Sequence, residues 1–307
     1  MYKINVLMST YNGELHLREQ IESIMEQKDV DVMLTIRDDG SSDGTVDVIR
    51  DNIKKYGKRI KLYTGHNIGY RKSFRRLLKY ASKANYYAFA DQDDVWMDEK
   101  LINAVRLIER ECQDDEVCLY ASSDIVTDEK LNPVGIHDIS NMHKSIQGYY
   151  SRARLAGCTY VFSPACMDIA RRFADVNFPR TADPDHDFII GSIALSCGRL
   201  VLDSNAYIYH RRTNHSVTSG GNGFSQRVKV EYDLTFKRKG MHYVMAETSL
   251  RVLGDKLSDE AEVFFKDVIN YKKSFKNQLK LLTNSEMKSG VKLGDIETKL
   301  KILLNIY

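Results

Sequence analysis

The segment Tyr86-Tyr87-Ala88-Phe89-Ala90-Asp91-Gln92-Asp93-Asp94 joins a wholly apolar run to a cluster of three carboxylates. The apolar run is short and rich in aromatic residues, as expected of a buried strand. The same arrangement occurs earlier, where the run 33–36 precedes the acidic cluster 38–43. In an open α/β sheet, ligands bind beyond the carboxyl ends of the strands. Both acidic clusters are therefore expected at the ligand-binding edge of one sheet.

The two clusters differ in what else could explain them. Carboxylates that converge repel one another and resist ionisation unless a cation joins them. A hard divalent metal that also binds substrate phosphates would supply that cation. The cluster 38–43 is equally good turn and N-cap chemistry for a helix over 45–55. The cluster 91–94 contains more carboxylates than one helix cap requires, which favours a metal site there.

Length and composition limit the class of protein. A chain of 307 residues can hold one large α/β domain and a smaller appendage. Its apolar stretches fall short of the ~18 residues of a membrane span, and residues 1–3 lead into a strand rather than a signal peptide. We therefore expect a cytoplasmic protein. The cysteines are odd in number and lack a Cys-x-x-Cys pair, which predicts reduced, mostly buried thiols and neither a disulfide framework nor a zinc site. These cysteines are Cys112, Cys118, Cys158, Cys166 and Cys197.

The net charge of +3 is unevenly distributed along the chain. Residues 227–307 contain sixteen Lys or Arg and eleven Asp or Glu, a net charge of +5, which leaves −2 for residues 1–226. A basic helical tail could favour an anionic membrane surface. It could equally be an ordinary solvated helical face that packs on the rest of the protein or on a second subunit.

The first half of the chain alternates between strand and helix patterns. Apolar runs at 5–8, 32–36, 60–63 and 86–90 predict strands, and amphipathic patterns at 16–27, 45–55, 71–83 and 99–111 predict helices. This order predicts a parallel sheet with right-handed connections. After a mixed segment from 117 to 223, helices are expected at 225–239, 243–253, 259–282 and 296–306. We therefore expect an α/β domain over 1–223 and a helical region over 224–307.

Four motifs carry a resemblance to a known family. They are Ser9-Thr10-Tyr11-Asn12-Gly13, Asp38-Asp39-Gly40-Ser41, Asn67-Ile68-Gly69 and Asp91-Gln92-Asp93-Asp94-Val95-Trp96, in that order. Their order and spacing resemble the nucleotide-sugar half of family 2 glycosyltransferases with the GT-A fold, over roughly residues 1–215. The last motif, with His186-Asp187 further on, most resembles bacterial rhamnosyltransferases of cell-wall and capsular polysaccharide synthesis. Neither a Walker motif nor a dinucleotide Gly-x-Gly-x-x-Gly is present in the sequence.

The resemblance implies a fold and a set of site residues. It implies an α/β fold with a GT-A-type mixed sheet flanked by helices, followed by a C-terminal helical extension. Asp39 would accept the N3–H of a uracil or thymine ring, and Tyr11 would pack against that ring. Asp93 would bind Mg²⁺ or Mn²⁺ directly, and Asp91 would face the ribose or a metal-bound water. Nucleotide-sugar contacts are expected from Thr10, Tyr11, Asn12, Asp38, Asp39, Asn67, Gly69, Lys72, Asp91, Gln92, Asp94 and Arg212, and metal ligands from Asp93, Asp91 and His210.

The resemblance also implies a catalytic base in the second half of the domain. Asp187 matches the family's acidic dipeptide best, although His186 replaces the usual Glu, and Asp185 is the reserve candidate. In the strip 209–216, His210, Arg212 and His215 are alternative contacts to the diphosphate. Tyr149 and Tyr150 lie where the family contacts its acceptor, but they fit core positions better.

The expected function is therefore that of an inverting, metal-dependent glycosyltransferase. dTDP-rhamnose is the preferred donor and a UDP-sugar is the alternative. The expected acceptor is a lipid-linked saccharide, with peripheral membrane contact through the C-terminal helices and a homodimer as further expectations. A nucleotidyltransferase would need a basic phosphate-binding loop that 9–13 lacks, and a metal-dependent carbohydrate-binding module would need neither a parallel sheet nor a base. Dispersed basic residues argue against nucleic acid as a partner.

Overall fold

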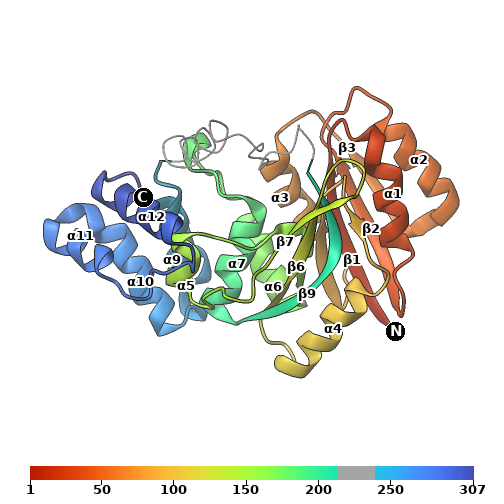
Figure 1. The fold of residues 1–307 in the computed structure, drawn as a ribbon. Coiled ribbons are helices and arrows are strands. Elements are labelled where there is room, and N and C mark those ends of the chain that lie inside the picture. The colour runs from red at the N-terminus through yellow and green to blue at the C-terminus, as the bar shows by residue number, and fades with distance from the viewer. Residues whose placement is uncertain (213–238) are drawn as a thin grey trace. The chain divides into compact units, whose positions relative to one another are not determined.

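The structure, a computed structural model, describes residues 1–212 and 239–307 (Figure 1). These residues form two compact units. Unit 1 comprises Met1–Ser140, Leu155–Asp175 and Arg199–Arg212, and unit 2 comprises Asn141–Arg154 and Val176–Gly198 together with the C-terminal part of the chain. The predicted boundary between 223 and 224, the helix predicted at 225–239 except its last residue, and His215 lie outside the described residues.

The alternation predicted for the first 111 residues is confirmed in unit 1. Strands β1, β2, β3 and β4 pair in parallel in the order β3-β2-β1-β4. The elements are β1 (Tyr2–Thr10), α1 (Glu14–Met25), β2 (Val30–Asp38), α2 (Thr45–Tyr56), β3 (Ile60–Thr64), α3 (Tyr70–Tyr80), β4 (Tyr86–Ala90), β5 (Val95–Trp96) and α4 (Lys100–Glu111). The carboxyl ends of the four parallel strands β1–β4 therefore share one edge of the sheet.

The later strands turn this parallel sheet into the mixed sheet that the family resemblance implies. Strand β8 pairs antiparallel with both β4 and β6, and β9 pairs parallel with β6 and antiparallel with β5. Strand β7 pairs with β6 outside the main order. The additional elements of unit 1 are β6 (Cys118–Thr127), β7 (Pro133–His137), β8 (Val161–Phe162), α6 (Pro164–Phe173) and β9 (Arg199–Arg211), and 3-10 turns lie at Gly57–Arg59 and Gly157–Thr159.

The sheet of unit 1 is buried on both faces, as parallel sheets usually are. Helices α1, α2 and α4 supply apolar side chains such as Leu17, Ile49 and Leu101 to a core shared with alternate residues of β1, β2 and β4. On the other face, the rings of Phe74 from α3 and Phe89 from β4 lie 5.4 Å apart, centre to centre. Covering both faces leaves the carboxyl edge of the strands as the place where polar residues can gather.

Unit 2 is mostly helical and is built around aromatic side chains. The ring of Tyr150 lies 5.1 Å from that of Phe188 and 5.4 Å from that of Phe264. Tyr149 and Tyr150 are buried, so the prediction that they belong to the core is confirmed. Within the described part of unit 2, the helices are α5 (Ile146–Ser151), α7 (His186–Cys197), α9 (Met241–Leu253), α10 (Asp259–Asn270), α11 (Phe275–Leu282) and α12 (Lys292–Leu303), with 3-10 turns at Arg180–Ala182, Gly254–Lys256 and Tyr271–Lys273.

The single helix predicted over 259–282 is wrong, because the chain breaks it near residue 274. A 3-10 turn ends α10, and Ser274 then adopts extended backbone with φ −160°. The Ser274 hydroxyl accepts a hydrogen bond from the amide of Asn277 at 3.2 Å, which starts α11. A serine N-cap competes with helix continuation in this way, and the apolar periodicity on both sides concealed it.

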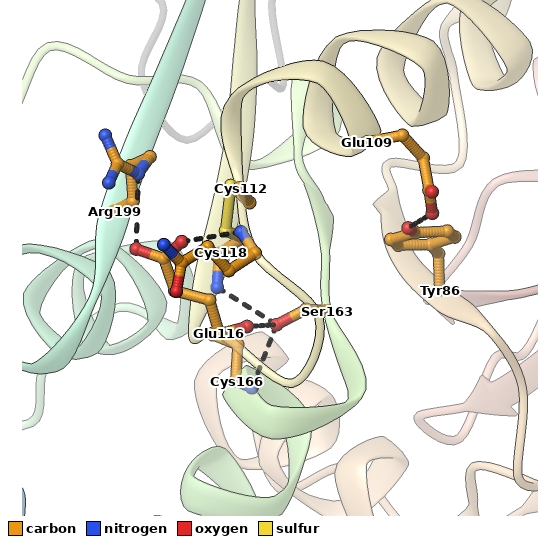
Figure 2. Close-up of a disulfide and its surroundings, with 9 residues drawn as sticks. Tyr86, Glu109, Cys112, Glu116, Cys118, Ser163, Cys166 and Arg199 are labelled. Atoms are coloured by element: carbon orange, nitrogen blue, oxygen red, sulfur yellow. Dashed lines mark hydrogen bonds and ion pairs between the residues drawn. A yellow bond between two sulfur atoms is a disulfide. The ribbon is translucent and has the colours of Figure 1, made fainter.

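The prediction that all five cysteines are reduced is also wrong. Cys112, at the end of α4, forms a disulfide with Cys118, at the start of β6 (Figure 2). The turn between them is fixed by Ser163, whose hydroxyl donates to the carbonyl of Glu116 at 2.8 Å and accepts from the amide of Cys118 at 3.0 Å. The odd cysteine count was a poor guide because a tight turn can bring two thiols together locally. Cys158, Cys166 and Cys197 are free.

Candidate active site

The carboxyl ends of β1, β2 and β4 bring three of the four motifs together in unit 1. In the register of the sheet, Thr10 lies opposite Asp38, and Met8 lies opposite Ala90, the residue before Asp91. The hydroxyl of Thr10 donates to Oδ1 of Asp38 at 3.1 Å. The strand ends therefore place the first motif between the two acidic clusters.

Asp38 holds the turn that follows β2. Its Oδ2 accepts from the amides of Gly40 and Ser41 at 3.1 and 3.0 Å, and its Oδ1 accepts from the Ser41 hydroxyl at 2.5 Å. Gly40 has φ +83°, and a Cβ there would lie 2.9 Å from the backbone nitrogen of Asn67. The turn chemistry proposed for this cluster is therefore present, and it is carried by Asp38.

Asp39 is buried beside an arginine. Its Oδ1 accepts from Arg37 at 2.5 Å and from the amide of Ile68 at 2.9 Å, and its Oδ2 accepts from the amide of Gly69 at 2.8 Å. An ionised carboxylate offers about four acceptor positions, so Oδ2 keeps one for a further donor. The arrangement fixes the Asn67-Ile68-Gly69 loop to the end of β2.

The first loop and the second acidic cluster are joined by Tyr11 and Gln92. The amide of Tyr11 donates to Oε1 of Gln92 at 2.8 Å, and Nε2 of Gln92 donates back to the Tyr11 carbonyl at 3.1 Å. The side chain of Tyr11 is 48% exposed, so its ring is accessible for stacking. Asn12 accepts from the amide of Ser42 at 2.9 Å and thereby links the first loop to the Asp38 turn.

The loop before α3 supplies the remaining nucleotide-sugar candidates. Oδ1 of Asn67 accepts from the amide of Gly69 at 3.1 Å, and Gly69 has φ +84°, a conformation that favours glycine. Lys72, in the first turn of α3, is exposed, whereas Arg75 on the same helix is buried. Of the basic residues of this helix, Lys72 is therefore one that a solvated anion can reach.

Burial disfavours the ionised form of each of the three carboxylates after β4, and repulsion from neighbouring carboxylates adds to this for Asp91 and Asp94. Burial, with the nearby Asp94 and Asp93, raises the pKa of Asp91 to about 7. Burial raises the pKa of Asp94 to about 6 and also raises that of Asp93. Oδ1 of Asp94 accepts a hydrogen bond from the amide of Arg211 at 3.1 Å, and its buried Oδ2 has no hydrogen-bond partner among the described residues. A cation at this edge would relieve the repulsion.

His210 faces this cluster from β9, and two neighbouring strands orient it. Nδ1 of His210 lies 2.9 Å from Oδ2 of Asp124 on β6, and Nδ1 of His137 on β7 lies 2.9 Å from Oδ1 of the same carboxylate. Both histidines donate if the carboxylate of Asp124 is ionised, because an ionised carboxylate can only accept. Burial raises the pKa of Asp124, but the hydrogen bonds from the two histidines outweigh it and hold the pKa below its usual range. Burial lowers the pKa of His210, but its bond to Asp124 and the charge of Asp94 more than offset this and raise the pKa to about 9.

The predicted metal residues Asp91 and His210 are brought together, with a cysteine that the sequence did not suggest. Asp93, the predicted direct ligand, does not belong to this group. One ligand atom each from Asp91, Cys158 and His210 lie within 4.8 Å of one another. A histidine whose other ring nitrogen donates to a carboxylate is the usual form of a metal-bound imidazole. The carboxylate of Asp91 suits Mg²⁺ or Mn²⁺, whereas a thiol such as that of Cys158 is not a ligand that these ions prefer. The acidic residues of the site therefore fit the expected divalent ion, and Cys158 does not.

Arg211 and Lys100 are further site residues that the sequence did not single out. Nε of the buried Arg211 donates to the carbonyl of Asp93 at 2.8 Å, and its NH2 donates to Glu19 at 2.7 Å. Nζ of the buried Lys100 lies 3.6 Å from the centre of the Trp96 ring, and burial lowers its pKa to about 7. Arg212, the predicted diphosphate contact, is exposed, and its amide donates to the carbonyl of Thr127 at 3.0 Å.

Asp187, the predicted base, belongs to unit 2. It lies in the first turn of α7, directly after Asp185 at the N-cap and the buried His186. Its Oδ1 accepts from the amide of Phe188 at 2.7 Å, and its carbonyl accepts from the hydroxyl of Tyr149 at 3.2 Å. The half-buried carboxylate is thus held at a helix N-terminus, where negative charge is favoured.

Comparisons with known proteins agree with this geometry. The family model described as Glycosyl transferase family 2 matches residues 5–176. The dTDP-rhamnosyl transferase RfbG of Shigella flexneri is 32% identical over 199 residues, which are 61% of this chain and 64% of that protein. The UDP-Glc:alpha-D-GlcNAc-diphosphoundecaprenol beta-1,3-glucosyltransferase WfgD of Escherichia coli is 34% identical over 33% of this chain and 38% of its own. These matches cover less than two thirds of the relatives' lengths.

Solved structures share the fold. Residues 1–349 of TarS from S. aureus, in complex with UDP-GlcNAc, superpose with a TM-score of 0.59 at 16% identity, covering 99% of this chain and 82% of that one. At this identity, the match shows a common architecture of a mixed sheet with flanking helices. Among the described residues, no helix is long and apolar enough to cross a membrane.

Proposed function

The chain belongs to glycosyl transferase family 2, and we propose that it is an inverting, metal-dependent enzyme that transfers a sugar from a nucleotide diphosphate to a saccharide acceptor. One observation carries the metal dependence. Asp91, Asp93 and Asp94 follow β4 at the edge of the sheet, where burial raises the pKa of each, and His210 is oriented towards them by Asp124. Such a cluster is most stable around a divalent cation.

The residues of unit 1 would bind the donor. Asp93, Asp91 and His210 would hold Mg²⁺ or Mn²⁺, which when bound neutralises the charge that develops on the diphosphate leaving group. The remaining acceptor position on Asp39 would take the N3–H of a pyrimidine base, and the exposed ring of Tyr11 would stack on that base. Lys72 and Arg212 are the exposed cations that would pair with the phosphates.

Asp187 would be the base of the reaction. Its carboxylate would take the proton of the acceptor hydroxyl as that oxygen bonds to the anomeric carbon and the bond from that carbon to the diphosphate breaks. Attack from the face opposite the leaving group inverts the configuration. The contacts that hold Asp187 at the start of α7 keep its carboxylate in a defined orientation, which general-base catalysis requires. Asp185 remains the reserve candidate.

The proposed donor is dTDP-rhamnose, because RfbG is named as a dTDP-rhamnosyl transferase. A UDP-sugar is the alternative, since WfgD is named for UDP-Glc and TarS was solved with UDP-GlcNAc. WfgD is also named for an undecaprenol-linked acceptor, which supports a lipid-linked saccharide here. Such an acceptor would place the protein in the cytoplasm at the inner face of the membrane.

A panel of donors tests this proposal. The protein is incubated with dTDP-rhamnose, UDP-glucose, UDP-N-acetylglucosamine and GDP-mannose, with Mg²⁺ or Mn²⁺, and binding is followed by calorimetry beside nucleotide release. We expect dTDP-rhamnose to bind most tightly and to be turned over when lipid-linked saccharide is added. Preference for a UDP-sugar would move the assignment to the alternative donor. A protein that binds none of the four donors would contradict the proposal.

A further inference from the structure

Helix α12 carries an apolar stripe on the face that it turns away from the protein. Leu293, Ile296, Leu300 and Leu303 follow one another at helical spacing and are 76%, 62%, 44% and 54% exposed. A surface helix normally turns such a stripe towards the core. The reversed orientation requires an explanation.

Contacts on the inner face fix the orientation of α12. The hydroxyl of Thr298 donates to the carbonyl of Ser151 at 2.5 Å, and Asp295 accepts from the Ser151 hydroxyl at 2.9 Å. Gly294 lies so close to α5 that a Cβ would meet Cδ of Arg152 at 2.5 Å. Rotating the helix to bury its leucines would break all of these contacts.

Helix α11 extends the same surface. Phe275 and Leu279 lie one turn apart and are 73% and 46% exposed. Nε2 of Gln278 donates to the carbonyl of Ile302 at 2.9 Å, which joins α11 to the end of α12. Figure 1 shows where these two helices lie in the chain. We name this surface the apolar foot. Its members are Phe275, Leu279, Leu293, Ile296, Leu300, Leu303 and Leu304.

The foot is surrounded by positive charge. Residues 271–307, all of which are described, contain eight lysines and three acidic residues, a net charge of +5. Of the three acids only Glu286 is exposed, because Asp295 is bound by serines and Glu297 pairs with Lys301 at 2.6 Å. The exposed lysines are Lys272, Lys273, Lys276, Lys280, Lys288, Lys292 and Lys299. Of these, Lys280 pairs with Asp267 of α10 at 2.6 Å.

We propose that the apolar foot docks on an anionic lipid surface. Exposed leucine and phenylalanine side chains would enter the boundary between headgroups and acyl chains, and the lysines around them would lie against lipid phosphates. A second copy of the chain fits less well, because it would bring a second charge of +5 against the first. The surface lies wholly within unit 2, and the inference rests on neither the donor nor the metal of the proposed function.

Vesicle co-sedimentation tests the proposal in the absence of nucleotide sugar. The full chain is mixed with vesicles of phosphatidylcholine alone or with about one third phosphatidylglycerol, at low and high salt. We expect the protein to bind only the anionic vesicles and to be released by high salt, because screening weakens charge attraction. Leu293→Ser with Ile296→Ser should weaken binding by about tenfold or more. Lys292→Gln with Lys299→Gln should weaken it by about fivefold per lysine.

A matched control removes the same kind of apolar surface elsewhere. Val134 and Ile136 on β7 are 65% and 68% exposed, and Val134→Ser with Ile136→Ser should leave vesicle binding unchanged. Circular dichroism verifies that each variant is folded. Equal binding to neutral and anionic vesicles, or equal binding by the foot and control variants, would overturn the proposal. The proposal would also be overturned if the wild type did not bind vesicles but formed a dimer that the foot substitutions convert to a monomer. A second copy of the chain would then be the occupant of the foot.

Discussion

Asp91→Asn should stabilise the metal-free protein, by an amount that grows with pH. Burial, with Asp94 and Asp93, raises the pKa of Asp91 to about 7, whereas an aspartate in an unfolded chain titrates near ~3.9. Folding therefore favours the protonated carboxyl. The stability that it contributes is fully present below about pH 4 and is lost as the pH rises through 7.

The size of the effect follows from the same two values. A difference of about three pH units corresponds to about 4 kcal/mol above pH 7 and to about 1–2 kcal/mol at pH 5. Burial is the largest cause of the shift, and an asparagine at this position is still a polar group that burial disfavours, so the substitution should recover about half of these amounts. We therefore expect a gain of about 2 kcal/mol at pH 8 and less than about 1 kcal/mol at pH 5.

Urea unfolding in EDTA at pH 5 and pH 8 measures both values. Asp98→Asn is the control, since the Asp98 side chain is 62% exposed and lies outside the cluster, and it should show no gain that grows with pH. Adding Mg²⁺ at pH 8 should stabilise the wild type more than the variant. A variant that is less stable than wild type at pH 8, or a gain of equal size at both pH values, would refute the reasoning.

Three further predictions concern other parts of the molecule. Replacing Cys112 and Cys118 by serine should lower the free energy of unfolding by about 2 kcal/mol. The bridge restricts the unfolded chain, and its short loop keeps this effect modest. An unchanged urea midpoint would show that the bridge adds nothing. Asp187→Asn should reduce turnover by roughly 10²–10⁴ while calorimetry finds donor affinity unchanged, and near-normal turnover would move the base to another carboxylate. Asp39→Asn should cost about 3–5 kcal/mol of stability in urea, because it leaves the buried charge of Arg37 unpaired, and a smaller loss than about 1 kcal/mol would mean that Arg37 finds another partner.

The parallel half of the sheet could be predicted because its signals are local. Each of these strands is an apolar run, and each connecting helix has its own amphipathic pattern, so β1–β4 and α1–α4 were predicted with end points shifted by only a few residues. The two-residue strand β5 was not predicted. The acidic clusters could be placed at the sheet edge for the same reason. Strand order and chain direction beyond residue 117 depend on pairings between distant segments, which the sequence does not display.

The part of the site that was missed depends on those distant pairings. Asp124 reaches His210 only because β6 pairs with β9 in a register that places Val126 opposite His210. The one local signal was the charged residue Asp124 within the buried strand 118–127. Cys158 comes near Asp91 through the folding of yet another segment. Neither contact can be read from spacing along the chain.

Nucleotide release from dTDP-rhamnose, measured with and without divalent metal for the wild type and Asp93→Ala, tests the central claim most directly. A lipid-linked saccharide acceptor is present in every reaction, and circular dichroism verifies that the variant is folded. We predict that the wild type releases dTDP with Mg²⁺ or Mn²⁺ but not in EDTA, and that folded Asp93→Ala releases little under either condition. Full activity of the wild type in EDTA, together with an active Asp93→Ala, would show that the acidic cluster after β4 is not a metal site.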